Sequence, residues 1–261
     1  MKLRVSGYEL NLVVDGSPKA PPLLLLHALA TNGHMFDDAI AELARHFRCI
    51  RVDLRGHGLS EAPPRPYAFK AYVADLLGVL DHLGIARTHV LGVSLGGMIA
   101  QHLGLIAPER IERLVLVSTT SRTPLEARPV WQERMDTVSA HGVASQIEPT
   151  LARWFTDGYA KTAPNVFAQI GEMIGKTSQT GYLGACDAIM ELDVTGQLKG
   201  LRGPTLVMVG EQDQGTPVSA AQAIQAAVPD ARLVVVPDAS HMLPIEQREA
   251  FLNHTLAFLR A

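Results

Sequence analysis

The stretch VLGVSLGGMIAQ, residues 90–101, decides the fold. It places a single serine, Ser94, among glycines where an apolar run ends and an apolar helical pattern begins. A G-x-S-x-G sequence in this setting forms a sharp strand-to-helix turn that exposes the serine hydroxyl. Because the serine on such a turn has a strained backbone, Gly92 and Gly96 are needed to leave space. The pattern predicts that Ser94 is a nucleophile.

The alternative for Ser94 is a helix N-cap beside glycines that only pack a helix against a strand. The neighbouring sequence favours the turn, because THVLG (88–92) has the pattern of a strand and LGGMIAQHLGLIA (95–107) that of a helix. Ser94 then lies at the carboxyl end of a strand, where parallel sheets bind their ligands. The amino end of the following helix points to the same place and favours negative charge there.

Strand patterns and helical patterns alternate along the chain. Two short segments at the start alternate polar and apolar residues, and six later ones are apolar runs typical of strands buried on both faces. Helical periods cover 73–83, 218–228 and 246–259. This alternation predicts an α/β protein with a mostly parallel central sheet flanked by helices. The predicted strands are 3–6, 9–14, 21–26, 47–53, 88–92, 111–120, 204–210 and 231–238.

The alternation stops in residues 121–199. This region has no convincing strand pattern and contains short helical pieces, several glycines and both tryptophans. We expect it to be a helical cap, inserted after the sixth strand and folded over one edge of the sheet. Residues 1–120 and 200–261 then form the core domain.

The composition narrows the function classes. The chain has 261 residues, 47% of them hydrophobic and 19% charged, with a formal charge of −3 and no basic block that would indicate nucleic-acid binding. The apolar run at 21–26 is too short to cross a membrane, and the amino terminus lacks a signal-peptide pattern. The ten histidines and two cysteines show no metal-type spacing. We expect a soluble, cytoplasmic protein without metal or cofactor, of open oligomeric state.

Two further residues are expected at the same sheet edge as Ser94. A serine hydroxyl needs a base to accept its proton, and the base needs a third group to hold its tautomer. Asp213 follows the strand at 204–210, and His241 follows the strand at 231–238. The chain order of serine, acid and histidine suits this kind of fold. We therefore predict a catalytic triad of Ser94, Asp213 and His241.

Other assignments stay open for the acid and the histidine. Asp213 can instead be a loop acid or a helix N-cap, and Glu211 and Asp238 are rival acids. Glu211 comes too early after its strand, and Asp238 lies on the loop of His241 itself. His241 can instead be an ordinary surface histidine. His102 lies within the helix after the G-x-S-x-G turn and should point away from the nucleophile.

Acyl transfer also needs N–H donors for the negative oxygen that develops on the carbonyl. The residue after the nucleophile, Leu95, should supply one, and the loop after the strand at 21–26 should supply another. In that loop, HALAT (27–31), we assign Leu29, with Ala28 as the alternative. His27 is expected to brace the loop rather than to act on the substrate.

Together these residues resemble the α/β-hydrolase superfamily over nearly the whole chain. VDLRGHGLS (52–60) is similar to the family's structural turn after the fourth strand. Within the superfamily the chain looks most like the 3-oxoadipate enol-lactonases. That resemblance implies hydrolysis of a small enol-lactone that carries a carboxylate, in bacterial degradation of aromatic compounds. The supporting stretches are APERIERLVLVSTT (107–120), RWFTDGY (153–159), GYLGACDAIMELD (181–193), PTLVMVGEQDQGTP (204–217) and DASHMLPIEQREAF (238–251).

The chain departs from the enol-lactonase pattern within the stretch 181–193. Met190 stands where those enzymes commonly have an arginine. Arg134 and Arg153 are then the candidates for holding a carboxylate. Trp131 and Trp154 are candidates for lining the pocket, although aromatic residues in such an insertion more often serve packing.

Rival functions exist on the same scaffold. They are a general carboxylesterase, a C–C bond hydrolase and a cofactor-free haloperoxidase. From another class, a ligand-binding receptor can retain the triad and turn over slowly. The expected partner is in each case a small molecule, here an ester or lactone, and not a nucleic acid or a membrane.

Overall fold

The computed structural model describes all residues from 1 to 261. Its strands are β1 (Lys2–Val5), β2 (Tyr8–Asp15), β3 (Pro22–Leu26), β4 (Arg48–Val52), β5 (Thr88–Val93), β6 (Ile111–Val117), β7 (Thr205–Gly210) and β8 (Arg232–Val236). They form one sheet in the order β1-β2-β4-β3-β5-β6-β7-β8. Strands β3 to β8 pair in parallel, whereas β2 is antiparallel to both β4 and β1. The predicted α/β class and mostly parallel sheet are confirmed.

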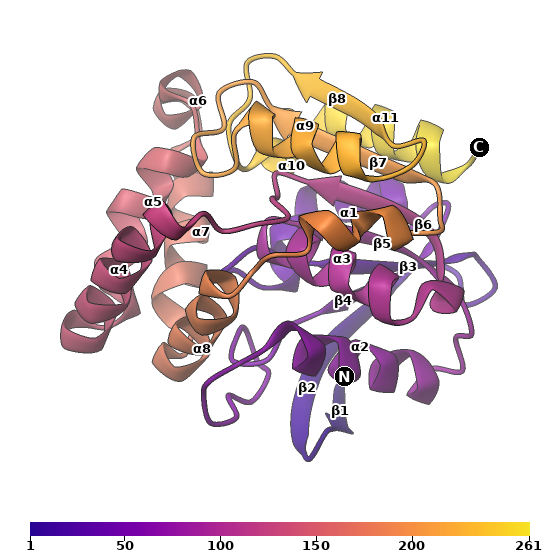
Figure 1. Cartoon of the computed structure of the whole chain (residues 1–261), viewed down its shortest axis with the longest axis horizontal. Helices are drawn as coiled ribbons and strands as arrows, with labels where there is room; N and C mark the ends of the chain where they lie inside the picture. Colours follow the sequence, from indigo (N-terminus) through magenta and orange to yellow (C-terminus); the bar gives the residue numbers. More distant parts are fainter.

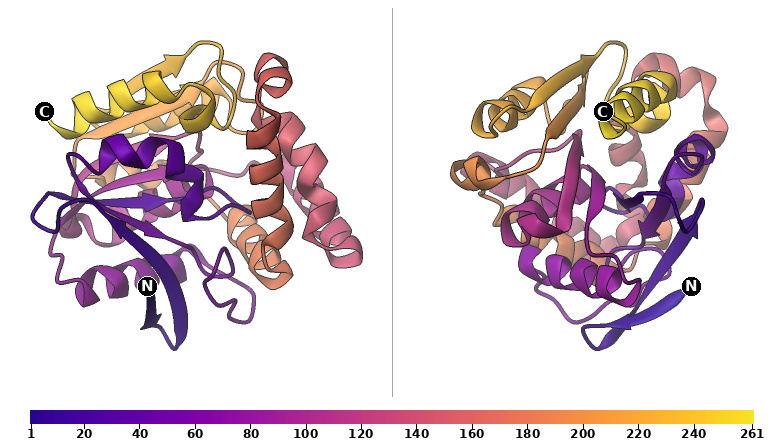
Figure 2. Two further views of the ribbon diagram at one scale, coloured as in Figure 1. Left: turned by 180° about the vertical axis from the view of Figure 1, so that it is seen from behind. Right: turned by 90° about the vertical axis from the view of Figure 1, so that its right-hand side faces the viewer.

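Helices cover both faces of this sheet. They are α1 (Asp37–Leu43), α2 (Phe69–His82), α3 (Leu95–Ile106), α4 (Arg128–His141), α5 (Ile147–Trp154), α6 (Asp157–Thr162), α7 (Pro164–Lys176), α8 (Gln179–Met190), α9 (Val218–Ala227), α10 (Leu243–Glu246) and α11 (Arg248–Leu259). Figure 2 shows α1 and α11 on one face and α2, α3 and α9 on the other. Because both faces are covered, β5 and β7 are buried at every residue and read as continuous apolar runs.

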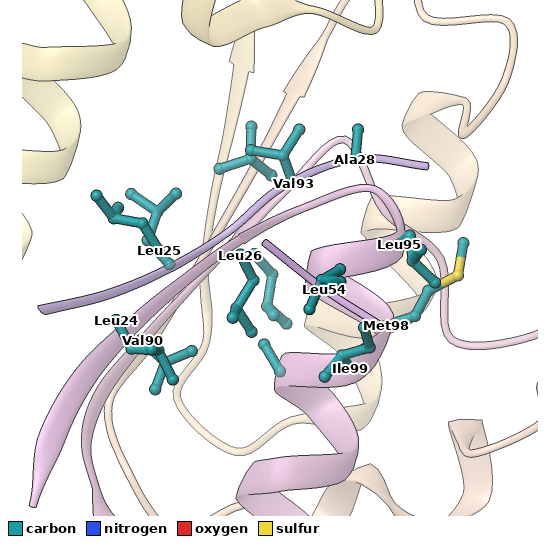
Figure 3. Packing of buried hydrophobic residues seen from close by; sticks show 14 of the residues in the cluster. Leu24, Leu25, Leu26, Ala28, Leu54, Val90, Val93, Leu95, Met98 and Ile99 are labelled. Atoms are coloured by element: carbon teal, nitrogen blue, oxygen red, sulfur yellow. The ribbon is translucent and has the colours of Figure 1, made fainter. Parts of the chain in front are cut away.

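The strand order reverses around β3. The chain places β4 on one side of β3 and then β5 on the other. Loops that leave the carboxyl ends of β3 and β5 therefore part, and a crevice opens between them. Ser94 follows β5, and the loop 27–31 follows β3. Figure 3 shows the apolar packing beneath this point, which includes Leu24 and Leu26 of β3, Val90 of β5, and Met98 and Ile99 of α3.

Between β6 and β7 the chain forms the helices α4 to α8. It forms no strand there apart from an isolated bridge between Arg122 and Asp193. Figure 1 shows these helices grouped beside the sheet. The division into a core of 1–120 and 200–261 and a cap of 121–199 stays a prediction. None of the helices combines the length and the apolar character that crossing a membrane requires.

Several predicted elements differ from the structure at their ends, and one core helix is absent from the prediction. The strand predicted over 111–120 ends at Val117, because Ser118 turns the backbone to φ +46°. The helix predicted over 246–259 is divided at Gln247, whose φ of −123° and ψ of 55° are not helical. Helix α1 was not predicted, because its seven residues make fewer than two turns and carry too short a periodic pattern.

Candidate active site

Ser94 forms the turn between β5 and α3. Its backbone has φ +53° and ψ −112°, a conformation that residues other than glycine rarely adopt. A Cβ atom at Gly92 would overlap the backbone of Gly96, and one at Gly96 would overlap the carbonyl of Leu26 in β3. Both motif glycines are therefore sterically required. The Ser94 side chain makes no capping hydrogen bond to α3, so the plain N-cap alternative is wrong.

The Asp213 carboxylate holds His241. Its Oδ2 lies 2.9 Å from His241 Nδ1 and accepts the Thr216 hydroxyl at 2.8 Å. Its Oδ1 accepts the N–H groups of Gly215 and Thr216 at 2.8 and 2.9 Å. Burial acts to raise the carboxyl pKa, but the charge of His241 and these hydrogen bonds outweigh it, so the pKa of Asp213 is lowered. An ionised Asp213 accepts the Nδ1 proton, which leaves His241 Nε2 free to act as a base.

The rival assignments lie elsewhere. Glu211 and Asp238 are exposed, and neither side chain contacts His241. His102 Nδ1 donates to the Met98 carbonyl at 2.8 Å, and the His102 ring stacks on Phe69 with 4.1 Å between ring centres. Only Asp213 therefore serves as the partner acid of His241.

Ser94 and His241 line the same cavity, which has a volume of about 960 Å³. No hydrogen bond within the chain engages Ser94 Oγ or His241 Nε2. The two atoms that would exchange a proton in catalysis are thus free of competing partners. The structure brings the serine, the histidine and the histidine's acid to one place, as the sequence pattern predicts.

The loop after β3 distinguishes the two oxyanion candidates. Leu29 lines the cavity and Ala28 does not. The Ala28 N–H points to Met35 Sδ at 3.3 Å, so it is engaged elsewhere. Leu95 is the first residue of α3, where N–H groups have no partner within the helix. These contacts support Leu95 and Leu29 as the donors.

His27 braces this loop. Its Nε2 accepts the Leu54 N–H at 2.9 Å, and its Nδ1 donates to the Ala28 carbonyl at 2.8 Å. Burial lowers the pKa of His27, although the charge of Asp53 opposes the shift. Both ring nitrogens are used in the neutral form, and His27 does not line the cavity. Its contacts are those of a structural residue.

The predicted structural turn after β4 is built around Asp53. Its carboxylate accepts the N–H groups of Gly33 at 2.8 Å and Leu59 at 3.0 Å. Leu54, the next residue, is the donor to His27. The turn therefore supports the loop that carries Leu29.

All four residues singled out in the predicted cap line the cavity: Trp131, Arg134, Arg153 and Trp154. The Arg134 guanidinium lies 4.3 Å from the centre of the Trp131 ring. The Trp154 ring lies 5.7 Å from the imidazole of His241, measured between centres. Both tryptophans therefore line the cavity and also pack against the hydrophobic core.

Arg134 and Arg153 have no carboxylate partner in the chain, although other arginines such as Arg65 and Arg128 do. Both cavity arginines are half-buried. Burial and, second, the charge of Arg134 lower the pKa of Arg153. Two neighbouring positive groups without an acid give this part of the cavity an affinity for anions.

Two polar residues of the site were missed in the sequence. Thr216 donates both its hydroxyl and its backbone N–H to the Asp213 carboxylate. The sequence signal for this contact was a threonine three residues after an aspartate. Glu246 accepts the N–H groups of Ser240 and Thr156 at 2.7 and 2.9 Å. Because Thr156 is ninety residues away in the chain, no local pattern indicates this contact.

Comparison with known proteins agrees with this geometry. A family model described as the α/β hydrolase fold matches residues 21–247. The chain is 32% identical to 3-oxoadipate enol-lactonase 2 of Acinetobacter baylyi, over 97% of this chain and 94% of that protein. It is also 32% identical to a pimeloyl-(acyl-carrier protein) methyl ester esterase of Chromobacterium violaceum, over 97% and 96% of the two chains.

A solved structure is similar over the full length. The crystal structure of the enol-lactonase from Burkholderia xenovorans has a TM-score of 0.97 and 34% identity, with 100% of each chain covered. The sequence similarity, the sheet topology and the strand-to-helix turn at Ser94 all indicate the same family. The chain belongs to the α/β-hydrolase family.

Proposed function

We propose that this protein is a serine hydrolase that cleaves a small carboxylic ester or lactone through an acyl-enzyme. One observation carries the proposal. Ser94 and His241 line one cavity, and neither Ser94 Oγ nor His241 Nε2 is engaged in a hydrogen bond, while His241 Nδ1 is held by Asp213 at 2.9 Å. This is the arrangement that activates a hydroxyl by general base catalysis.

In the first half-reaction Ser94 Oγ attacks the substrate carbonyl, and His241 Nε2 takes its proton. The N–H groups of Leu95 and Leu29 hold the oxyanion, a contribution worth about 2.7–4 kcal/mol per donor in other hydrolases. Asp213 stabilises the imidazolium that forms. His241 then returns the proton to the leaving oxygen as the C–O bond breaks. With a lactone that oxygen stays attached to the acyl group, because the ring opens.

In the second half-reaction a water molecule replaces the leaving group. His241 Nε2 takes a proton from the water, and the hydroxide attacks the acyl carbon. The tetrahedral intermediate collapses, and Ser94 Oγ leaves with the proton held by His241. The products are a carboxylic acid and the free enzyme.

We propose further that the substrate is an enol-lactone of the 3-oxoadipate type, held beneath a cap of residues 121–199. The similarity to the enol-lactonases of Acinetobacter baylyi and Burkholderia xenovorans supports a lactone as the substrate. The two acid-free arginines, Arg134 and Arg153, support a carboxylate on the substrate, with Trp131 and Trp154 against its carbon skeleton. These residues take the place of an arginine at the position of Met190.

A second candidate is an esterase for a larger substrate. The cavity of about 960 Å³ lies at the upper end of the range for drug-sized ligands, about 300–1,000 Å³, and is large for a small lactone. The methyl ester esterase relative supports the same alternative.

The deciding experiment compares kcat/KM for 3-oxoadipate enol-lactone with that for a neutral short-chain p-nitrophenyl ester. We expect the lactone to be preferred and Ser94→Ala to lose activity on both while keeping its circular dichroism spectrum. Preference for the neutral ester would reject the lactone as the substrate but would leave the assignment as a serine hydrolase unchanged. Wild-type turnover by purified Ser94→Ala would reject the serine mechanism itself.

A further inference from the structure

The buried carboxylate of Glu246 joins two segments that both reach the active site. Glu246 ends α10 and is 9% exposed. One oxygen, Oε2, accepts the N–H of Ser240 at 2.7 Å. The other, Oε1, accepts both the N–H of Thr156, at 2.9 Å, and the Thr156 hydroxyl. No arginine, lysine or histidine pairs with Glu246, so these N–H and O–H donors alone satisfy its carboxylate.

Both joined segments carry residues of the cavity. Ser240 immediately precedes His241, and Thr156 lies two residues after Trp154. The two segments touch at further points. The Met242 N–H donates to the Trp154 carbonyl at 3.0 Å, and the Ser240 hydroxyl donates to the Arg153 carbonyl at 3.2 Å. Residues on both sides of His241 are thus bound to residues 153–156, and Glu246 contributes the only charged group.

We propose that Glu246 is a positioning residue that sets His241 against Ser94 and fixes Arg153 and Trp154 over the same cavity. It does not touch the substrate. It acts through the backbone of the loop that holds His241, and through the start of α6, where Thr156 is the N-cap. This inference rests on the proposed function, because positioning of His241 matters only if His241 is the base.

The variant Glu246→Gln tests the contact at constant size. An amide has one accepting oxygen and one donating NH₂ group, whereas the carboxylate receives donors on both sides. Whichever way the amide turns, its NH₂ group opposes an N–H of Ser240 or of Thr156. The loop must then shift, and displacements of about 1 Å in an active site can cost about 100-fold in rate.

The experiment measures kcat per active site on the neutral p-nitrophenyl ester, with sites counted from the burst of p-nitrophenol. We expect Glu246→Gln to lower kcat about 10- to 100-fold. Thr156→Val, which loses the hydroxyl donor, should lower it less, and Thr156→Ser, which keeps the hydroxyl, should restore most of the loss. Asp238→Asn is the matched control, because Asp238 is an exposed acid on the same loop whose carboxylate makes no hydrogen bond.

A purely structural role for Glu246 would lower Tm and leave kcat per counted site unchanged, which would overturn the proposal. If Glu246→Gln does not fold, the difference between Thr156→Val and Thr156→Ser decides. Failure of the proposed function is distinguishable, because Ser94→Ala would then keep its turnover whatever happens at Glu246.

Discussion

Two buried histidines couple folding to pH at the scale of single residues. His27 and His57 are fully buried, and their ring centres lie 5.2 Å apart. Burial lowers the pKa of His27. Burial first, and the charge of His27 second, lower the pKa of His57 to about 3. In the unfolded chain a histidine titrates near pH 6.5, so the unfolded state takes up protons first as the pH falls.

We predict that the free energy of unfolding has its full value above about pH 6.5. Below that pH it should decline by about 1.4 kcal/mol per pH unit for each such histidine. For His57 the decline should continue down to its folded pKa of about 3. Urea unfolding between about pH 7.5 and pH 4.5 measures the slope, above the range where Asp213 is protonated. In His57→Gln the slope of the unfolding free energy against pH should fall by about 1.4 kcal/mol per pH unit, which corresponds to one proton fewer taken up on unfolding. An equal slope in both proteins would contradict this account.

At the scale of elements, two glycines dock α8 onto the core. A Cβ atom at Gly181 would overlap the backbone of Gly56 in the turn after β4. One at Gly184 would come within 2.7 Å of the Tyr67 ring. The GYLG stretch (181–184) is thus explained by the close approach of a helix to the core.

Gly181→Ala should therefore lower the free energy of unfolding by about 1–3 kcal/mol, because backbone rather than a flexible side chain must move. The control is Gly158→Ala in α6, where nothing lies closer than 4.0 Å to the new Cβ atom. That change should be neutral or raise stability by up to about 1 kcal/mol through helix propensity. Urea denaturation of both variants tests the pair, and equal effects would remove the docking argument.

At the scale of the whole molecule, the cavity is assembled from segments far apart in the chain. Leu29 and Ser94 come from the turns that follow β3 and β5, Arg134 and Arg153 from the helices between β6 and β7, and His241 from the loop after β8. The net charge is −3, so the positive group in the cavity is local and not a property of the surface as a whole. Substrate selection by charge is then expected to depend on these two arginines.

We predict that Arg134→Gln and Arg153→Gln each lower kcat/KM for the carboxylate-bearing lactone about 10- to 100-fold, the value of one or two charge-assisted hydrogen bonds. The neutral p-nitrophenyl ester should change by less than about threefold. Arg202→Gln changes the net charge equally at an exposed position outside the cavity and should leave both rates unchanged. A parallel loss on both substrates would show that the arginines only support the fold.

The amino-acid sequence by itself determined what depends on local patterns. Continuous apolar runs predicted the strands that are buried on both faces, and a period of 3.6 residues predicted α2, α9 and α11, because burial imposes these patterns on neighbouring residues. The glycines around Ser94 marked the turn, because a strained backbone excludes side chains within a few positions. Asp213 and His241 could be placed at the same edge, since each follows a parallel strand.

Only the tertiary structure decided what depends on contacts between distant residues. It supported Leu29 over Ala28, because the Ala28 N–H is engaged by Met35 Sδ. It also brought Arg134 and Arg153, neither of which pairs with a carboxylate, into one cavity. It also joined Glu246 to Thr156. Hydrogen bonds and ion pairs of this kind form between any suitable groups that folding brings together, so they leave no period or spacing in the sequence from which to read them.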